Sequence, residues 1–313
     1  MFPIHRGRRL RVNESIRSLV RETSLSPADF MFPMFIMEGE NTKVEIPSMP
    51  GIFRRTLDLT VEEVKELFAL GIRAVNIYVK VSDDLKDNTG KEAWNDNGLM
   101  QRAIRAIKAA CPEMIVMPDV ALDPYSIYGH DGIIEKGDVA NDATNDALVK
   151  MAVSHAKAGA DFVAPSDMMD GRVLRLRQGL DAAGFHNVGI MSYSAKYASA
   201  FYGPFRDALD SAPKDADVEV PKDKKTYQMD YANRIEAVKE ALWDVEEGAD
   251  MVMVKPGIAY LDIVREVKNA VDVPVTVFHV SGEYAMIKAA SERGWLDHDK
   301  IMMEQLMCIK RAG

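Results

Sequence analysis

Residues 232–280, ANRIEAVKEALWDVEEGADMVMVKPGIAYLDIVREVKNAVDVPVTVFHV, alternate between helical and strand patterns. In 232–248 and 261–270, apolar residues recur three and four positions apart, as in amphipathic helices. MVMVKPG at 251–257 and VPVTVFHV at 273–280 are rich in apolar residues on neighbouring positions, which is typical of parallel strands covered on both faces. The stretch therefore predicts two helix–strand units of an α/β fold.

The same alternation extends over most of the chain. Helical patterns separate five further strand patterns, which occupy residues 30–36, 74–78, 114–122, 161–166 and 188–194. Because polar residues gather at the carboxyl ends of the strands, we expect a TIM (β/α)₈ barrel rather than an open doubly wound sheet. Only seven strands precede Gly313. Either the chain continues beyond it into an eighth strand or the barrel closes differently, and we favour the first.

Three regions are expected. Residues 1–29 are polar and basic with little core pattern, so they predict an extended N-terminal arm that packs on a neighbouring subunit, with a frayed terminus as the alternative. Residues 30–313 would form the TIM-barrel catalytic domain. Within it, residues 197–231 are a long connection rich in Pro, Asp and Lys that follows the end of a strand, which predicts an active-site lid.

Composition excludes several classes of protein. The 313 residues include 39 basic and 48 acidic side chains, and the net charge of −9 disfavours a nucleic-acid binder. No apolar run approaches the roughly 20 residues that span a bilayer, and the basic N-terminus lacks the apolar core of a secretory signal. We therefore expect a cytoplasmic protein. Cys111 and Cys308 are too few and too isolated for a disulfide framework or a thiolate zinc site.

Two lysines are candidate nucleophiles. Lys255 follows the apolar run MVMV, and Lys196 follows the run VGIMSYSA. An ammonium at the end of a buried strand loses hydration, which lowers its pKa, and a second lysine nearby lowers it further. Each would then be a candidate for Schiff-base formation. Taken singly, either could be an ordinary surface charge at a strand end.

Carboxylates gather in the segment DVALDPYSIYGHDG at 119–132. Asp119 and Asp123 are four positions apart, so alternation in a strand places them on the same face, and Asp131 lies in the loop that follows. The three could orient an amine, transfer protons or hold a hard cation, whereas turn formation is the alternative for Asp123 and Asp131. His130 has no partner for a zinc site, so packing or loop hydrogen bonding is expected of it.

Weaker signals come from five further residues. Ser166 lies at the end of a strand, and Arg206, Lys224 and Gln228 belong to the expected lid, where they could clamp a carboxylate or be solvated. Ser281 precedes a helix and could bind an anion or cap that helix.

These residues, in their order, resemble the porphobilinogen synthase (5-aminolaevulinate dehydratase) family along nearly the whole chain. The resemblance implies a TIM barrel with an N-terminal arm that wraps a neighbour, and homo-octamers built from arm-exchanging dimers. It also implies the condensation of two 5-aminolaevulinate molecules to porphobilinogen, with loss of two waters, in tetrapyrrole biosynthesis. The matching segments are RRLRVNESIRSLVRET, DVALDPYSIYGHDG, VAPSDMMDGRV, SYSAKYASAFYGPFRDA, KKTYQMD, VMVKPGIAYLDIVREVK and HVSGEYAM.

The resemblance also assigns roles. Lys255 would form the Schiff base with the substrate that supplies the propionate side, and Lys196 with the other. Asp119 would contact the substrate amine or assist proton transfer, with Ser166 nearby. One substrate carboxylate would be bound by lid residues and the second with help from Ser281. The lid residues are Arg206, Lys224 and Gln228.

Several departures from the family pattern bear on metals and binding. Where zinc-dependent members carry three cysteines, this chain has Ala121, Asp123 and Asp131, so no catalytic zinc is expected and the chain looks like the zinc-independent, magnesium-stimulated branch. Glu240 matches the allosteric magnesium position, with a solvated helix face as the alternative.

Two substitutions and one missing element affect substrate binding. Lys224 replaces an arginine, which turns a bidentate contact into a point charge. Phe278 replaces a tyrosine, which removes a hydroxyl from the site. The family's last strand, which bears a tyrosine that binds a substrate carboxylate, would lie beyond Gly313.

Two other interpretations stay open at this stage. A class I aldolase-like barrel would use a single Schiff-base lysine. An inactive assembly component would account for the missing eighth strand.

Overall fold

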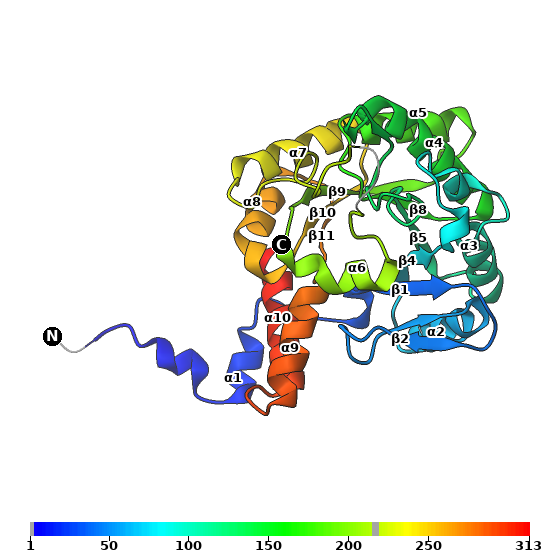
Figure 1. Cartoon of the computed structure of the whole chain (residues 1–313). Helices are drawn as coiled ribbons and strands as arrows, with labels where there is room; N and C mark the ends of the chain where they lie inside the picture. Colours follow the sequence, from blue (N-terminus) through cyan, green and yellow to red (C-terminus); the bar gives the residue numbers. More distant parts are fainter. Residues whose placement is uncertain (1–2, 215–218) are drawn as a thin grey trace.

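The computed structural model of the chain describes residues 3–214 and 219–313 (Figure 1). Strands lie in the middle of the molecule with helices around them. No helix within the described ranges is both long and apolar enough to cross a bilayer.

Seven parallel strands form the barrel wall, and they lie where the sequence predicted them. Their order is β11-β10-β9-β8-β5-β4-β1, so chain neighbours pair in space. The fold is an α/β TIM barrel with an N-terminal arm, as expected. The strands are β1 (Met31–Met37), β4 (Ala74–Lys80), β5 (Ile115–Val120), β8 (Phe162–Pro165), β9 (Gly189–Lys196), β10 (Met251–Lys255) and β11 (Val275–Val277).

Amphipathic helices cover the outside of the barrel. In α3, Leu99, Ala103, Ile104 and Ile107 are buried, at the three-and-four spacing that places them on one face. Left-handed glycines end α4 and α7. The covering helices are α2 (Leu57–Ala69), α3 (Leu99–Ala110), α4 (Asn141–Ala158), α5 (Arg172–Ala182), α7 (Ile235–Glu247), α8 (Leu261–Ala270), α9 (Ser281–Glu292) and α10 (His298–Ala312).

The barrel wall is open between β11 and β1. β1 pairs with β4 along its whole length, but its other edge pairs only at Phe35 and Ile36, with β3 (Phe53–Arg55). Strand β2 (Lys43–Glu45) then pairs antiparallel with β3. None of the described residues forms a strand between β11 and the first part of β1.

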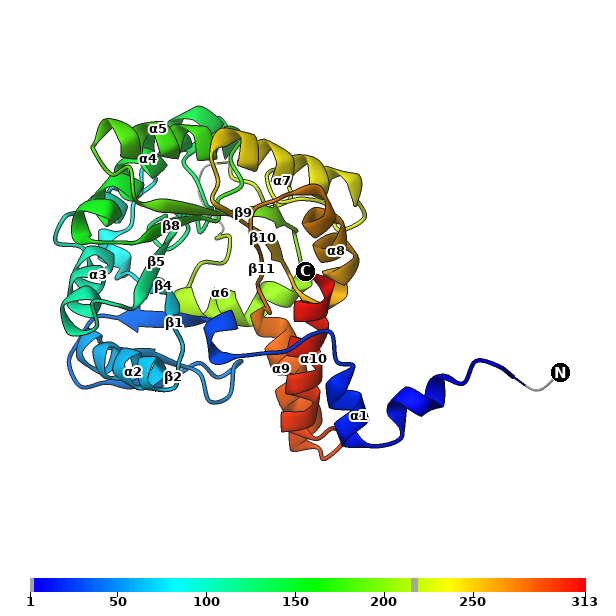
Figure 2. The same ribbon diagram turned by 180° about the vertical axis from the view of Figure 1, so that it is seen from behind.

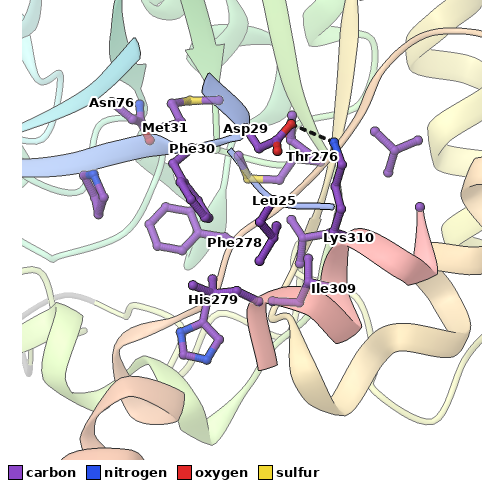
Figure 3. Close-up of a pocket in the computed structure, with 16 residues that line it drawn as sticks. Leu25, Asp29, Phe30, Met31, Asn76, Thr276, Phe278, His279, Ile309 and Lys310 are labelled. Atoms are coloured by element: carbon purple, nitrogen blue, oxygen red, sulfur yellow. Dashed lines mark hydrogen bonds and ion pairs between the residues drawn. The ribbon is translucent and has the colours of Figure 1, made fainter. Parts of the chain in front are cut away.

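An apolar cavity of about 290 Å³ lies at this opening (Figure 3). Met31, Met253 and Val277 line it from the strands, and Ile309 lines it from α10. Lys310 of α10 contacts Asp29 at 2.8 Å from Nζ to Oδ1, which holds the last helix against the segment that leads into β1. From the sequence we expected an eighth strand in this part of the barrel.

The N-terminal residues extend away from the barrel beside α9 and α10 (Figure 2). They contain a short 3₁₀ helix at Gly7–Arg11 and the helix α1 (Glu14–Leu19), whose first turn is capped by the Asn13 side chain. Several apolar side chains in this segment are strongly exposed: Ile4 is 74% exposed, Leu10 is 55%, Val12 is 70% and Leu19 is 84%. Apolar side chains left in solvent are a feature of surfaces that another chain covers.

The expected lid, residues 197–231, is partly helical. It contains a 3₁₀ turn at Ala200–Tyr202 and the short helix α6 (Gly203–Leu209), which contacts α9 and β4. Residues 215–218 of this segment lie outside the described residues. Its end returns to the barrel, where the backbone N–H of Met229 donates to the carbonyl of Lys196 at 3.1 Å.

Candidate active site

A small cavity at the carboxyl ends of the strands brings together nine of the twelve predicted site residues. It measures about 30 Å³, which leaves room for only a few water molecules. Tyr78, Tyr202, Phe205 and Ser211 also line it. The nine predicted residues are Asp119, Asp123, Asp131, Ser166, Lys196, Arg206, Lys224, Gln228 and Lys255.

Lys255 ends strand β10 and lies in an aromatic surround. Its side chain is buried, and burial together with the nearby Lys196 charge lowers the pKa of the amine to about 7. A large fraction of this lysine is therefore the free amine at neutral pH. Its Nζ lies 4.2 Å from the ring centre of Phe278, 4.7 Å from Phe205, 5.2 Å from Tyr193 and 5.3 Å from Tyr202.

Lys196 ends the neighbouring strand, β9, in direct register with Lys255. Side chains at paired positions of adjacent parallel strands point to the same face, so both amines face the cavity. The Lys196 ammonium donates to the carbonyl oxygen of Ser166, and its Nζ lies 3.4 Å from Oδ2 of Asp131. The pairing of β9 with β10 is thus what places two buried lysines side by side.

The three carboxylates differ in charge state. Burial and the neighbouring Asp123 raise the pKa of Asp119 to about 7, and its Oδ1 has no hydrogen-bond partner among the described residues. Burial also raises the pKa of Asp123. Burial alone would raise the pKa of Asp131 as well, but the charges of Lys196 and Lys224 hold it well below its usual value. Asp131 is therefore the fixed negative charge, and Asp119 is the group poised to gain or lose a proton.

Asp123 reaches the cavity by a different route from the one predicted. Strand β5 ends at Val120, so strand alternation does not place Asp123 beside Asp119. Asp123 is instead placed by the loop after β5, in which the Leu122 N–H donates to the carbonyl of Asp131 at 3.0 Å.

Lid residues bring positive charge and donors to the cavity. Lys224 donates to Asp131 Oδ1 at 2.8 Å and lies 3.5 Å from Asp123 Oδ2. Gln228 donates to Asp131 Oδ2 at 3.3 Å, while its own Oε1 has no partner in the described part of the chain. Arg206 lines the same cavity from α6. A guanidinium, an ammonium and an amide in one place suit a carboxylate ligand.

Three predicted residues lie outside the cavity. Phe278 contacts Lys255, as described above. Ser281 begins α9, where its hydroxyl accepts from the Phe205 N–H at 3.0 Å and donates to the Phe201 carbonyl at 3.3 Å. Glu240, on α7, lines a separate cavity of about 440 Å³, and burial raises its pKa to about 7.

Sequence reasoning missed three of the four aromatic residues around Lys255 and predicted only Phe278. Tyr202 and Phe205 belong to the expected lid, but nothing local marks them as facing a lysine. Tyr193 was detectable in principle, since alternation along β9 places it inside the barrel with Met191. The Tyr193 hydroxyl lies 2.7 Å from that of Tyr78 and donates to Asn76 Oδ1 at 2.8 Å.

Two adjacent buried amines, one with a pKa near 7, next to a carboxyl group of similar pKa define a TIM-barrel enzyme of the Schiff-base class. A site built around a single lysine does not fit this arrangement.

Comparison with known proteins specifies the family. Residues 4–313 match the delta-aminolevulinic acid dehydratase family model. The chain is 50% identical to delta-aminolevulinic acid dehydratase of Synechococcus elongatus, covering 100% of this chain and 95% of that one. It is 48% identical to the Bacillus subtilis enzyme of that name, covering 99% and 93%.

A solved structure agrees. Delta-aminolevulinic acid dehydratase (porphobilinogen synthase) from Toxoplasma gondii ME49, in complex with the reaction product porphobilinogen, matches with a TM-score of 0.96 and 47% identity, over 100% of this chain and 88% of that one. The chain belongs to the delta-aminolevulinic acid dehydratase family. Its function is accordingly that of a lyase that makes porphobilinogen for tetrapyrrole biosynthesis.

Proposed function

We propose that this chain condenses two molecules of 5-aminolaevulinate through two Schiff bases, one on Lys255 and one on Lys196. The observation that carries the proposal is the register of β9 with β10, which sets the two lysines at paired positions over one cavity. Each ketone loses its oxygen as water when the imine forms. One imine makes the adjacent carbon of its substrate acidic, and that carbon attacks the imine carbon of the other substrate. The amine of that second substrate then attacks the imine carbon of the first, and each lysine leaves as a free amine, so that two waters are the only other products.

Proton transfer falls to Asp119. Its pKa of about 7 matches that of Lys255, so it can accept a proton at one step and return it at another near neutral pH. Its unpartnered Oδ1 is also free to accept a hydrogen bond from the substrate amine. Ser166 lines the cavity beside it. Asp131 stays ionised and holds the Lys196 ammonium until substrate arrives.

The substrate carboxylates would be held on the two sides of the cavity. Lys224 and Gln228 lie against Asp131, next to Lys196, so with Arg206 they would bind the carboxylate of the substrate on that lysine. Ser281 would help to bind the second carboxylate, on the Lys255 side. Its hydroxyl must then leave the backbone groups of the lid that it now contacts.

A catalytic zinc does not suit the residues present. Asp123 and Asp131 already face the Lys224 ammonium, and Asp131 also faces Lys196, so a divalent cation would have to enter among positive charges. Ala121 offers no ligand. These contacts support a reaction that does not use metal coordination by this segment.

An allosteric magnesium ion would be held by Glu240. The charged residues that line the cavity beside it are Asp138, Asp170, Asp230 and Glu236, together with one basic residue, Lys225. Magnesium keeps several of its waters and takes few protein ligands directly, so a roomy acidic cavity suits it. The raised pKa of Glu240, caused first by burial, is what a bound cation would lower. Bound there, the ion would supply only charge, outside the reaction.

Self-association into a homo-octamer through the arm is part of the same proposal. The exposed Ile4, Leu10 and Leu19 support it, because a free arm gains from covering them.

Porphobilinogen formation from 5-aminolaevulinate tests these proposals in three conditions: with EDTA, with magnesium added after EDTA, and with zinc added after EDTA. We expect product in EDTA and more product with magnesium. Rescue by zinc alone would overturn the metal assignment. A Glu240→Gln variant should form product without responding to magnesium. No product in any condition would overturn the proposed mechanism for this chain.

A further inference from the structure

Four consecutive residues, Tyr128–Asp131, contact the lid along its length. The carbonyl of Tyr128 accepts from the Lys214 N–H at 3.1 Å. At Gly129, which has a φ of +70°, an added Cβ would lie 2.1 Å from the Ala212 carbonyl oxygen, so only glycine allows this approach. Asp131 accepts from two lid side chains, as described above. This segment is therefore the surface on which the closed lid rests.

His130 makes two contacts with the lid, one from each ring nitrogen. Its Nδ1 lies 3.0 Å from the hydroxyl of Tyr227, and its Nε2 lies 2.8 Å from the carbonyl oxygen of Pro221. The residue is fully buried, and it does not line the cavity of the two lysines. It therefore cannot touch substrate, although it neighbours Asp131 in the chain.

The hydrogen bonds around His130 have one consistent direction. A carbonyl can only accept, so Nε2 carries the hydrogen and donates to Pro221. In the neutral ring Nδ1 then accepts from the Tyr227 hydroxyl, whose oxygen in turn accepts from the Asp131 N–H at 3.3 Å. Burial lowers the pKa of His130, which favours this neutral form. Each polar group in the chain of contacts has a partner.

Tyr227 lies between the two lid residues that reach Asp131. The Gln228 N–H donates to the Lys224 carbonyl at 2.9 Å, so residues 224–228 form one turn. Fixing the Tyr227 hydroxyl therefore fixes where Lys224 and Gln228 point. The contact with Pro221 holds the chain just before that turn.

We propose that His130 is a positioning residue for the reaction: through Pro221 and Tyr227 it holds Lys224 and Gln228 over the Lys196 side of the cavity. This inference rests on the proposed role of the two lid residues in binding a substrate carboxylate.

Steady-state kinetics of variants at His130 and Tyr227 test the proposal. His130→Ala removes both contacts with the lid, and Tyr227→Phe removes one of them together with the hydrogen bond that the hydroxyl accepts from the Asp131 N–H. We expect KM for 5-aminolaevulinate to rise about tenfold in His130→Ala, equivalent to roughly 1.4 kcal/mol, with kcat changed by less than about threefold. His130→Gln, which can still donate to Pro221, and His130→Asn, which can still accept from Tyr227, should lie between wild type and alanine.

Borohydride trapping adds a readout that a general loss of structure would not produce. At a substrate concentration below the wild-type KM, His130→Ala should show less trapping on Lys196, with trapping on Lys255 unchanged. Adding Tyr227→Phe to His130→Ala should raise KM by a smaller factor than Tyr227→Phe does in the wild type, because both changes remove the His130–Tyr227 contact. His186→Ala and Tyr231→Phe change exposed residues of the same types and should match wild type.

The outcomes distinguish a failure of the positioning role of His130 from a failure of the proposed function. An active wild type with unchanged KM in both His130→Ala and Tyr227→Phe overturns the positioning role. Equal loss of trapping at both lysines, or a fall in melting temperature that tracks the rise in KM across all four variants, also overturns it. If His130→Ala fails to fold, Tyr227→Phe and His130→Gln decide the question. An inactive wild type would instead overturn the proposed function.

Discussion

At the scale of single residues, the site depends on keeping one amine uncharged. Burial of Lys255 and the charge of Lys196 beside it both disfavour the ammonium form of Lys255. Asp119 is held near the same pKa by burial and by Asp123. The proposed nucleophile and the proposed proton-transfer group thus have similar pKa values because of their surroundings.

Replacing Lys255 by methionine should abolish activity and stabilise the fold. The folded-state pKa lies below the ordinary value of 10.5, so between about pH 7 and 10.5 the unfolded chain binds more protons. This lysine therefore costs stability at neutral pH, and the cost falls as the pH rises through that window. We expect the free energy of unfolding of Lys255→Met to exceed that of wild type by roughly 1–4 kcal/mol at pH 7 in urea denaturation.

A smaller difference between the two proteins at pH 10 would support this cause. A variant less stable than wild type at pH 7 would contradict it.

The pH profile of kcat/KM should rise with a midpoint near pH 7. Above that pH Lys255 is the free amine and Asp119 is ionised. Measuring borohydride trapping of Lys255 alone over the same range separates the lysine from the carboxyl group. A profile that is flat between pH 6 and 8 would be inconsistent with the raised pKa of Asp119 and the lowered pKa of Lys255.

At the scale of elements, strand pairing places the chemistry and buried ion pairs fix the helices to it. Arg172, at the start of α5, donates to the Ser192 hydroxyl at 3.0 Å and to the Tyr193 carbonyl at 3.2 Å, both on β9. It also pairs with Asp244 of α7 at 3.3 Å. One buried guanidinium therefore joins two helices to the strand that ends in Lys196.

Arg172→Leu should destabilise the fold by about 3–5 kcal/mol, because Asp244 is left buried and unpaired. Chemical denaturation measures this directly. Arg172→Leu combined with Asp244→Leu should recover part of the loss. Arg175 is on the same helix as Arg172 and forms an exposed ion pair with Asp146 of α4. Arg175→Ala should therefore cost no more than about 1 kcal/mol. Equal losses in Arg172→Leu and Arg175→Ala would show that burial does not set the cost.

Much at this scale could be predicted from the sequence. The seven strands are apolar on neighbouring residues, and Lys196, Lys255 and Asp119 stand at their carboxyl ends, so periodicity was sufficient to find them. The end of β5 at Val120 could not be predicted, since the apolar Ala121 and Leu122 continue the pattern. Neither could the aromatic surround of Lys255 or the lid contacts of His130, which join residues far apart in the chain.

At the scale of the whole molecule, the N-terminal arm carries several apolar side chains that the single chain leaves exposed to solvent. Leu19 is 84% exposed and Leu10 is 55% exposed, on a segment that projects from the barrel. Burying such side chains against a second copy contributes roughly 1.5–3 kcal/mol each. This gain supports the proposed assembly through the arm.

Leu19→Glu should therefore shift the protein to a smaller species in analytical ultracentrifugation. Leu70→Glu, which changes a leucine that is 71% exposed on the barrel rather than on the arm, is the matched control and should sediment like wild type. Equal sedimentation of all three proteins would refute assembly through the arm at Leu19.

Borohydride reduction in the presence of 5-aminolaevulinate, followed by peptide mass mapping, tests the central claim most directly. The two-lysine account predicts that both Lys196 and Lys255 carry the reduced substrate, and that Lys255→Met leaves Lys196 as the remaining site. Modification of only one of these lysines in the wild-type protein at saturating substrate, or of a lysine outside the cavity instead, would contradict it.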